Sequence, residues 1–88
     1  MKVAVFDTYV RTGAGEILHF DVLLPESDGQ YAEAYARRWV QEIGLPAASV
    51  QLEVCRFCHS EIPSPEVTQQ IRQQGYSILQ MEGCPAPV

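Results

Sequence analysis

The spacing of apolar residues changes from segment to segment along this chain, and this change limits its fold more than any other feature. Residues 2–10 are apolar on both faces, and residues 17–24 alternate apolar with polar, so both segments are expected to be strands. Residues 27–44 and 64–75 have helical spacing, whereas residues 50–55 alternate and residues 76–82 form a last strand. The order strand, strand, helix, strand, helix, strand predicts one sheet with two helices packed on it.

The first two strands are joined by Thr12-Gly13-Ala14-Gly15, a segment that suits a tight hairpin turn. The strands are therefore expected to pair antiparallel. Two registers remain open, because a two-residue loop pairs Thr8 with His19, while a three-residue loop sets Asp7 opposite Asp21.

Both helices carry boundary signals. Ser27-Asp28-Gly29-Gln30 has the pattern of a capping box, so the first helix is expected to begin there and to end at Gly44. Its aromatic stripe, with four-residue spacing, predicts a face buried against the sheet. The members of the stripe are Tyr31, Tyr35, Trp39 and Ile43. The second helix is expected to begin with Ser64 as N-cap and Pro65 at its first position, and to end at Gly75.

The helical connections also predict strand directions. A crossover helix usually joins parallel strands, so we expect a four-stranded mixed sheet in an α/β fold of the α+β type. A chain of 88 residues cannot support two separate cores. We therefore expect one domain over residues 1–84, followed by a flexible tail at residues 85–88.

Charge and hydropathy argue against two classes of partner. Eleven acidic against six basic residues give a net charge of -5, and the basic residues are scattered instead of forming the stripe that a nucleic acid requires. No segment is long and apolar enough to cross a membrane, and the apolar start lacks the cleavage site of an export signal. We expect a cytoplasmic protein whose partner is a protein or a small ligand, neither nucleic acid nor membrane.

The three cysteines are the residues of the chain that are best suited to bind a metal ion or to act as nucleophiles. Cys55, Cys58 and His59 form a Cys-x2-Cys-His segment, a spacing that lets two thiolates bind one tetrahedral ion. If the strands before Cys55 and Cys84 run parallel, their carboxyl ends meet at one edge of the sheet. The pattern predicts a soft-metal site, with zinc as the metal, at Cys55, Cys58, His59 and Cys84. The identity of the fourth ligand stays open, since Glu61 or the glutamate at residue 82 could also complete the site.

The same segment admits three other interpretations. Free cysteines are often buried and act as small apolar core residues. A thiol-dependent redox protein or enzyme would use Cys58 as its nucleophile, although this residue lies outside the first turn of the second helix. Cys-x-x-Cys-His is also the string that attaches c-type haem, with Met81 as an axial ligand, but we expect no export signal on this chain, and c-type haem attachment would need one.

Asp7, His19 and Asp21 form a second group, of the kind used in general acid and base catalysis. A strand histidine beside aspartates is more often a structural hydrogen-bond pair. The chain also lacks a nucleophile elbow, a phosphate loop and a paired glutamate motif. We therefore expect that the protein is not an enzyme and assign no catalytic residues.

Several segments carry a family resemblance. The longest are Phe6-Asp7-Thr8-Tyr9-Val10, His19-Phe20-Asp21-Val22, Phe57-Cys58-His59-Ser60-Glu61 and Met81-Glu82-Gly83-Cys84. With them the chain resembles an uncharacterised family of small bacterial proteins, catalogued as a domain of unknown function. The resemblance implies a small α/β fold and no activity. The expected role is a small binding or interaction module, with a thiol-dependent redox protein or enzyme using Cys58 as the alternative.

Overall fold

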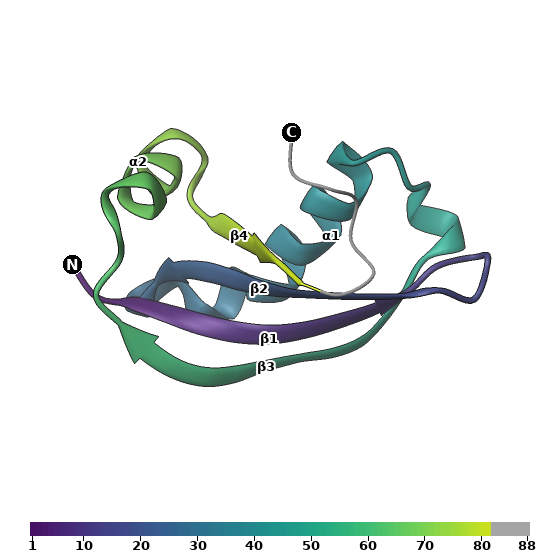
Figure 1. The fold of residues 1–88 in the computed structure, drawn as a ribbon, viewed down its shortest axis with the longest axis horizontal. Coiled ribbons are helices and arrows are strands. Elements are labelled where there is room, and N and C mark those ends of the chain that lie inside the picture. Colours follow the sequence, from purple (N-terminus) through teal and green to yellow (C-terminus); the bar gives the residue numbers. More distant parts are fainter. Residues whose placement is uncertain (82–88) are drawn as a thin grey trace.

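The computed structural model describes residues 1–81 as two helices, two 3₁₀ segments and four strands. In chain order these are β1 (Val3–Arg11), β2 (Ile17–Pro25), η1 (Glu26–Tyr31), α1 (Ala32–Glu42), η2 (Ala47–Ser49), β3 (Gln51–Glu61), α2 (Pro65–Gln74) and β4 (Ser77–Gln80). The strands form one sheet in the order β3-β1-β2-β4, with β3 and β4 at its two edges (Figure 1). The α+β class and the order of the elements are confirmed. The predicted tail at residues 85–88 lies outside the described residues.

The expectation of a mixed sheet is wrong, because every neighbouring pair of strands is antiparallel. The connection through α1 does join two strands of the same direction, β2 and β3. However, β1 lies between them, so they never pair. The connection through α2 then carries the chain from β3 at one edge of the sheet to β4 at the other. The carboxyl ends of β3 and β4 therefore do not meet at a common edge.

The hairpin adopts one of the two registers that the sequence left open. The amide of Thr12 donates to the carbonyl of Glu16 over 2.8 Å, which closes a three-residue loop. Gly15 in this loop has a φ of 84°, a conformation that glycine adopts readily. This register sets Asp7 directly opposite Asp21.

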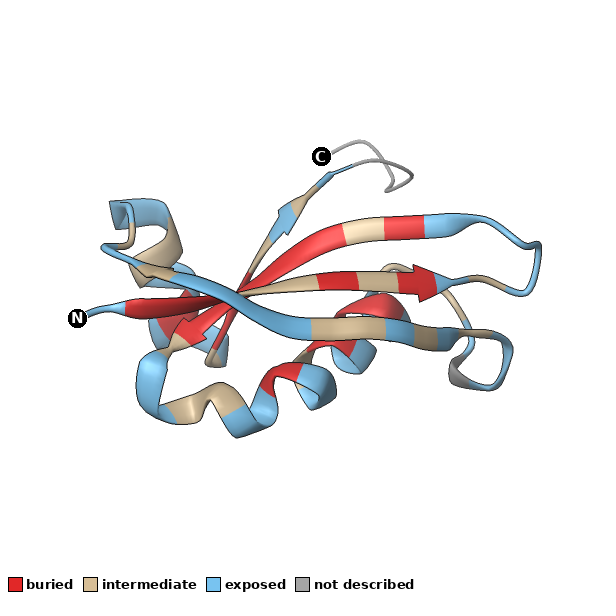
Figure 2. Ribbon diagram, turned by 90° about the horizontal axis from the view of Figure 1, so that it is seen from below, coloured by how far each residue is buried: buried red, intermediate tan, exposed pale blue. Residues whose placement is uncertain are grey.

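The core has two parts, on opposite faces of the sheet, because successive strand residues point to opposite sides. One part packs the inner side of α1 against β1 and β2; its members include Ala4, Phe20, Val22, Leu24, Ala36, Trp39 and Val40. The smaller part packs α2 on the other face; its members are Val3, Val5, Leu23, Val67 and Ile71. Buried residues concentrate on β1, β2 and α1, while β3 has none that is fully buried (Figure 2).

The predicted helix boundaries have different outcomes. The capping box is wrong: residues 27–30 lie within the 3₁₀ segment η1, and α1 begins only at Ala32 without a side-chain cap. The α2 boundaries are confirmed, since the Ser64 hydroxyl accepts from the amide of Val67 over 3.2 Å and Gly75 is left-handed at the end. The aromatic stripe is buried at Trp39 in α1 but exposed at Tyr31, which belongs to η1.

No helix within residues 1–81 is long and apolar enough to span a membrane.

Candidate functional site

The face of the sheet that carries α2 is only partly covered. Helix α2 packs over Val5 and Leu23 at one end of this face. Farther along the same face, the alternation of β1 and β2 brings up Asp7 and Asp21, with His19 beyond them. These three polar side chains thus come from the two central strands, whose positions are fixed by the core on the opposite face.

The three side chains converge on one point. His19 Nε2 lies 2.6 Å from Asp7 Oδ1, and one ligand atom from each of Asp7, His19 and Asp21 lies within 4.8 Å of the others. Tyr9 is the cross-strand partner of His19, and its ring stacks on the imidazole at a centroid distance of 4.1 Å and an angle of 7°. This stacking fixes the orientation of the imidazole ring. We name Asp7, His19 and Asp21 the carboxylate–imidazole cluster.

The surroundings of Asp21 disfavour its ionised form. Asp21 is only 9% exposed, and this burial raises the pKa of its carboxyl. The nearby charge of Asp7 raises this pKa further. His19 and His59 lower this pKa, and Glu61 raises it. Like charges directly opposite each other on two strands destabilise a sheet. The charges of Asp7 and Asp21 therefore repel each other, and a cation between them would relieve this repulsion.

Chemically, the cluster offers two carboxylates and one imidazole. Nitrogen and oxygen donors of this kind bind Zn²⁺ and related divalent ions, and three protein ligands leave a coordination position open. Two ligand atoms that each lie about 2.1 Å from one tetrahedral ion are about 3.4 Å apart. Binding therefore requires side-chain rotations that bring the ligand atoms of Asp7, His19 and Asp21 closer together by up to about 1.4 Å.

The structure separates the predicted cysteine ligands that it describes. Cys55 is half-buried opposite Thr8, accepts a 3.6 Å hydrogen bond from the Thr8 hydroxyl and packs on the α1 side of the sheet. His59 is opposite Val5 and therefore belongs to the α2 side. Burial raises the pKa of the Cys55 thiol, which favours its neutral form.

The other members of the predicted cysteine site are Cys58 and Cys84. Cys58 is exposed next to His59, and Cys84 lies outside the described residues. Within residues 1–81, the group of potential ligands close enough to hold one ion is the carboxylate–imidazole cluster, which contains no cysteine. A metal site at Cys55, Cys58, His59 and Cys84 stays a prediction.

Sequence reasoning identified the members of the carboxylate–imidazole cluster as an acid and base group but did not consider the two aspartates as metal ligands. The signal was present in the loop length, since the three-residue loop places the two aspartates opposite each other. The stacking of Tyr9 on His19 follows from the same register. The contacts made by His59 on β3 had no such signal, because they depend on an irregularity in the pairing of β1 with β3.

Fold and site together define a small α+β domain in which a four-stranded antiparallel sheet presents a carboxylate–imidazole cluster on a partly open face. The chain belongs to the family described as "Domain of unknown function (DUF2024)", which matches residues 1–81. This confirms the family resemblance that the sequence segments indicated.

Protein NE1680 from Nitrosomonas europaea, a target of the Northeast Structural Genomics Consortium solved by NMR, has a similar structure. The match has a TM-score of 0.74 and 39% sequence identity, and it covers 97% of this chain and 100% of that chain. A comparison with curated proteins found no match.

Proposed function

We propose that this protein is a small binding module that holds a divalent metal ion, such as Zn²⁺, at Asp7, His19 and Asp21. The observation that carries the proposal is the convergence of three ligand atoms within 4.8 Å on the partly open face of the sheet. A hydrogen-bonded pair of His19 and Asp7 would explain two of these side chains. The buried Asp21 carboxyl lies opposite Asp7, whose charge raises its pKa, and a cation bound between the two carboxylates would relieve this repulsion.

The donor set indicates which ions to test. Imidazole suits Zn²⁺, Fe²⁺, Ni²⁺ and Cu²⁺, whereas a site for Mg²⁺ or Ca²⁺ is built from oxygen ligands alone. Binding requires that the proton between His19 Nε2 and Asp7 Oδ1 leaves, so the metal competes with protons and its affinity falls as the pH is lowered. An open position on the ion would be available to water or to a small ligand.

We expect isothermal titration calorimetry to show one Zn²⁺ bound per chain, with the affinity reduced at least tenfold in Asp7→Asn and in His19→Gln. A loss of this size is expected because changes to residues that only support a metal ligand already cost about tenfold to a hundredfold. Glu33→Gln, which removes one negative charge from the exposed side of α1, is the matched control and should bind as the wild type does.

A second set of variants separates this site from the cysteine site. Replacing Cys55, Cys58 and Cys84 together by serine should leave the affinity for Zn²⁺ within about twofold of the wild type, because the carboxylate–imidazole cluster contains no thiol. Loss of binding in this triple variant, with Asp7→Asn unaffected, would assign the metal to the cysteines and refute our proposal.

A further inference from the structure

We propose that Cys58 is a site of reversible thiol modification, at which His59 and Glu61 activate the thiol for exchange with a low-molecular-weight disulfide. The site lies on the edge strand β3 and contains no member of the carboxylate–imidazole cluster. The inference therefore does not rest on metal binding at that cluster, and either proposal can fail while the other holds.

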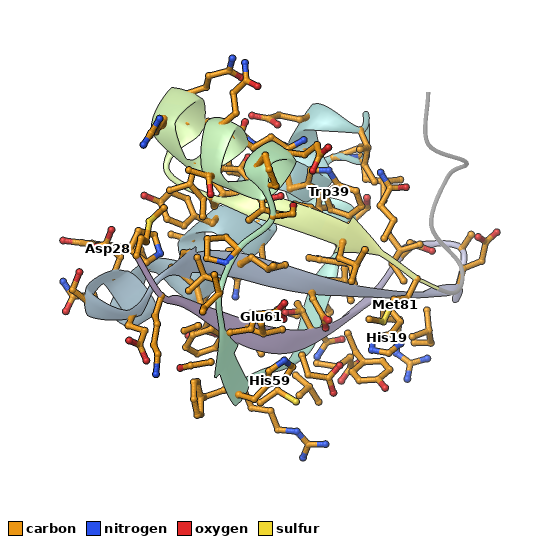
Figure 3. All side chains as sticks on the ribbon, turned by 60° about the vertical axis from the view of Figure 1, so that its left-hand side comes forward. His19, Asp28, Trp39, His59, Glu61 and Met81 are labelled. Carbon is orange, nitrogen blue, oxygen red and sulfur yellow. The ribbon has the colours of Figure 1, made fainter. Side chains whose placement is uncertain are left out.

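The three side chains form a hydrogen-bonded series. Cys58 Sγ lies 3.3 Å from His59 Nδ1, and His59 Nε2 lies 3.1 Å from Glu61 Oε1. All three residues are exposed, and Figure 3 shows His59 and Glu61 close together near the end of β3. A nucleophile, a base and a group that orients the base are thus arranged in the order that activated thiols require.

A β-bulge produces this arrangement. In a regular strand the side chains of Cys58 and His59 would point to opposite faces of the sheet. In β3, however, Phe57 is the partner of Phe6 and His59 is the partner of Val5, so that Cys58 is an extra residue without a partner on β1. A bulge changes the direction of a side chain and is often found next to functional groups. Here it brings the thiol to the ring of its own neighbour.

The contacts define the path of the proton. The Glu61 carboxylate accepts the Nε2–H of His59, which leaves Nδ1 as the acceptor for the thiol proton of Cys58. The Cys58 sulfur then attacks one sulfur of the disulfide. A new sulfur–sulfur bond forms to Cys58, the disulfide bond of the reagent breaks, and the leaving thiolate takes the proton from His59. The products are a mixed disulfide at Cys58 and one free thiol, so the exchange needs no further oxidant or reductant.

The product is expected to persist as a mixed disulfide. Cys55, the other described thiol, packs on the opposite side of the sheet and is half-buried, so it is poorly placed to attack the modified Cys58. A resolving cysteine is what converts such an intermediate into an internal disulfide. Within residues 1–81 no cysteine is placed to act as a resolving thiol, so release by these residues depends on an external thiol.

The test uses the full chain with Cys84→Ser in every variant, in the presence of a chelator, with oxidised glutathione as the disulfide. We expect mass spectrometry at neutral pH to find one glutathione on Cys58, added at least tenfold faster than on Cys55, and complete reversal by dithiothreitol. His59→Asn should slow the addition about tenfold, which is less than the roughly 10²–10⁴-fold that a positioned base typically contributes, because the site is open to water. Glu61→Gln should slow it less.

Two controls keep the outcome interpretable. Glu16→Gln, which removes one exposed carboxylate at the β1–β2 hairpin, should leave the rate unchanged and is the matched control for Glu61→Gln. Far-UV circular dichroism should show that His59→Asn is folded, as expected for an exposed residue. The inference is overturned if Cys55 reacts as fast as Cys58, or if folded His59→Asn reacts at the wild-type rate at neutral pH.

Discussion

The variant Asp21→Asn is expected to be more stable than the wild type without metal and to gain no stability when Zn²⁺ is added. In the metal-free wild type, the buried Asp21 carboxylate lies opposite the Asp7 carboxylate, and its pKa is raised. Asparagine has nearly the same shape and no charge, so the variant removes the repulsion. We expect a gain of about 1 kcal/mol, a size common for mutations that remove strain at a binding site. For a domain of this length, it corresponds to about 4–8 °C in Tm.

The pH dependence of this difference has a defined sign. Because the pKa of Asp21 is raised by folding, the folded protein holds the Asp21 proton more tightly than the unfolded chain does. The free energy of unfolding therefore falls as the pH rises from the ordinary carboxyl range through the raised pKa of Asp21. Asp21→Asn lacks this fall, so its advantage over the wild type should be absent in acid and present at neutral pH.

Thermal unfolding followed by circular dichroism, from about pH 4 to about pH 8, measures both effects of Asp21→Asn. In the wild type, saturating Zn²⁺ should raise the Tm, because a ligand that binds only the folded state stabilises it in proportion to the logarithm of its concentration. Glu33→Gln again serves as the control for charge. The account of the cluster fails if Asp21→Asn lowers the Tm at neutral pH, or if Zn²⁺ still stabilises the variant.

The variant Gly75→Ala is expected to destabilise the protein by about 2–5 kcal/mol. Gly75 ends α2 with a φ of 96°, and a left-handed conformation costs alanine about 1–2 kcal/mol. In addition, a Cβ at this position would lie 2.7 Å from the Tyr35 hydroxyl oxygen. The ring of Tyr35 is stacked on the fully buried Tyr76 at a centroid distance of 4.6 Å, so it cannot simply move away. Forced overpacking of this kind adds about 1–3 kcal/mol.

The chain provides a matched control in Gly44. Its φ is 97°, nearly the same as that of Gly75, but a Cβ there would have no atom within 4 Å. Gly44→Ala should therefore show the conformational cost alone, about 1–2 kcal/mol. Urea unfolding of the two variants measures the difference directly. Equal losses of stability would show that the contact with Tyr35 contributes nothing.

Local signals in the sequence predicted those features that depend on neighbouring residues. Ser64, Pro65 and Gly75 define the ends of α2 because a cap, a fixed φ and a left-handed glycine act within one helical turn. The capping box at residues 27–30 was misleading for a physical reason. The chain leaves β2 at Pro25 and first forms the 3₁₀ segment η1, so the α-helix begins later, at Ala32.

Features that depend on long-range pairing could not be predicted in the same way. The strand β3 could pair with either edge of the hairpin that β1 and β2 form. It pairs with β1, so that β1 lies between β2 and β3. The wrong expectation of parallel neighbours led directly to the expected meeting of Cys55 and Cys84 at one sheet edge. The bulge at Cys58 is likewise a property of the pairing, because hydrophobic periodicity does not reveal where a strand holds one extra residue.

The candidate site likewise combines features that depend on neighbouring residues with features that depend on the complete fold. The sequence left two hairpin registers open, and only one of them places Asp7 opposite Asp21. Once the loop is known to have three residues, the contact of His19 with Asp7 and the stacking of Tyr9 on His19 follow from the pleat of the strands. The electrostatic cost at Asp21 depends in addition on burial, which is set by the complete fold.

The most direct test of a metal ion at the carboxylate–imidazole cluster is a titration of ¹⁵N-labelled protein with Co²⁺, followed by NMR and by visible absorption. Co²⁺ is paramagnetic and broadens the amide signals nearest to it, and thiolate ligands give it an intense charge-transfer absorption. We predict that broadening is centred on Asp7, His19 and Asp21 and that no thiolate absorption develops. Broadening centred on Cys55 and Cys58 with a thiolate band, or no localised broadening, would contradict this account.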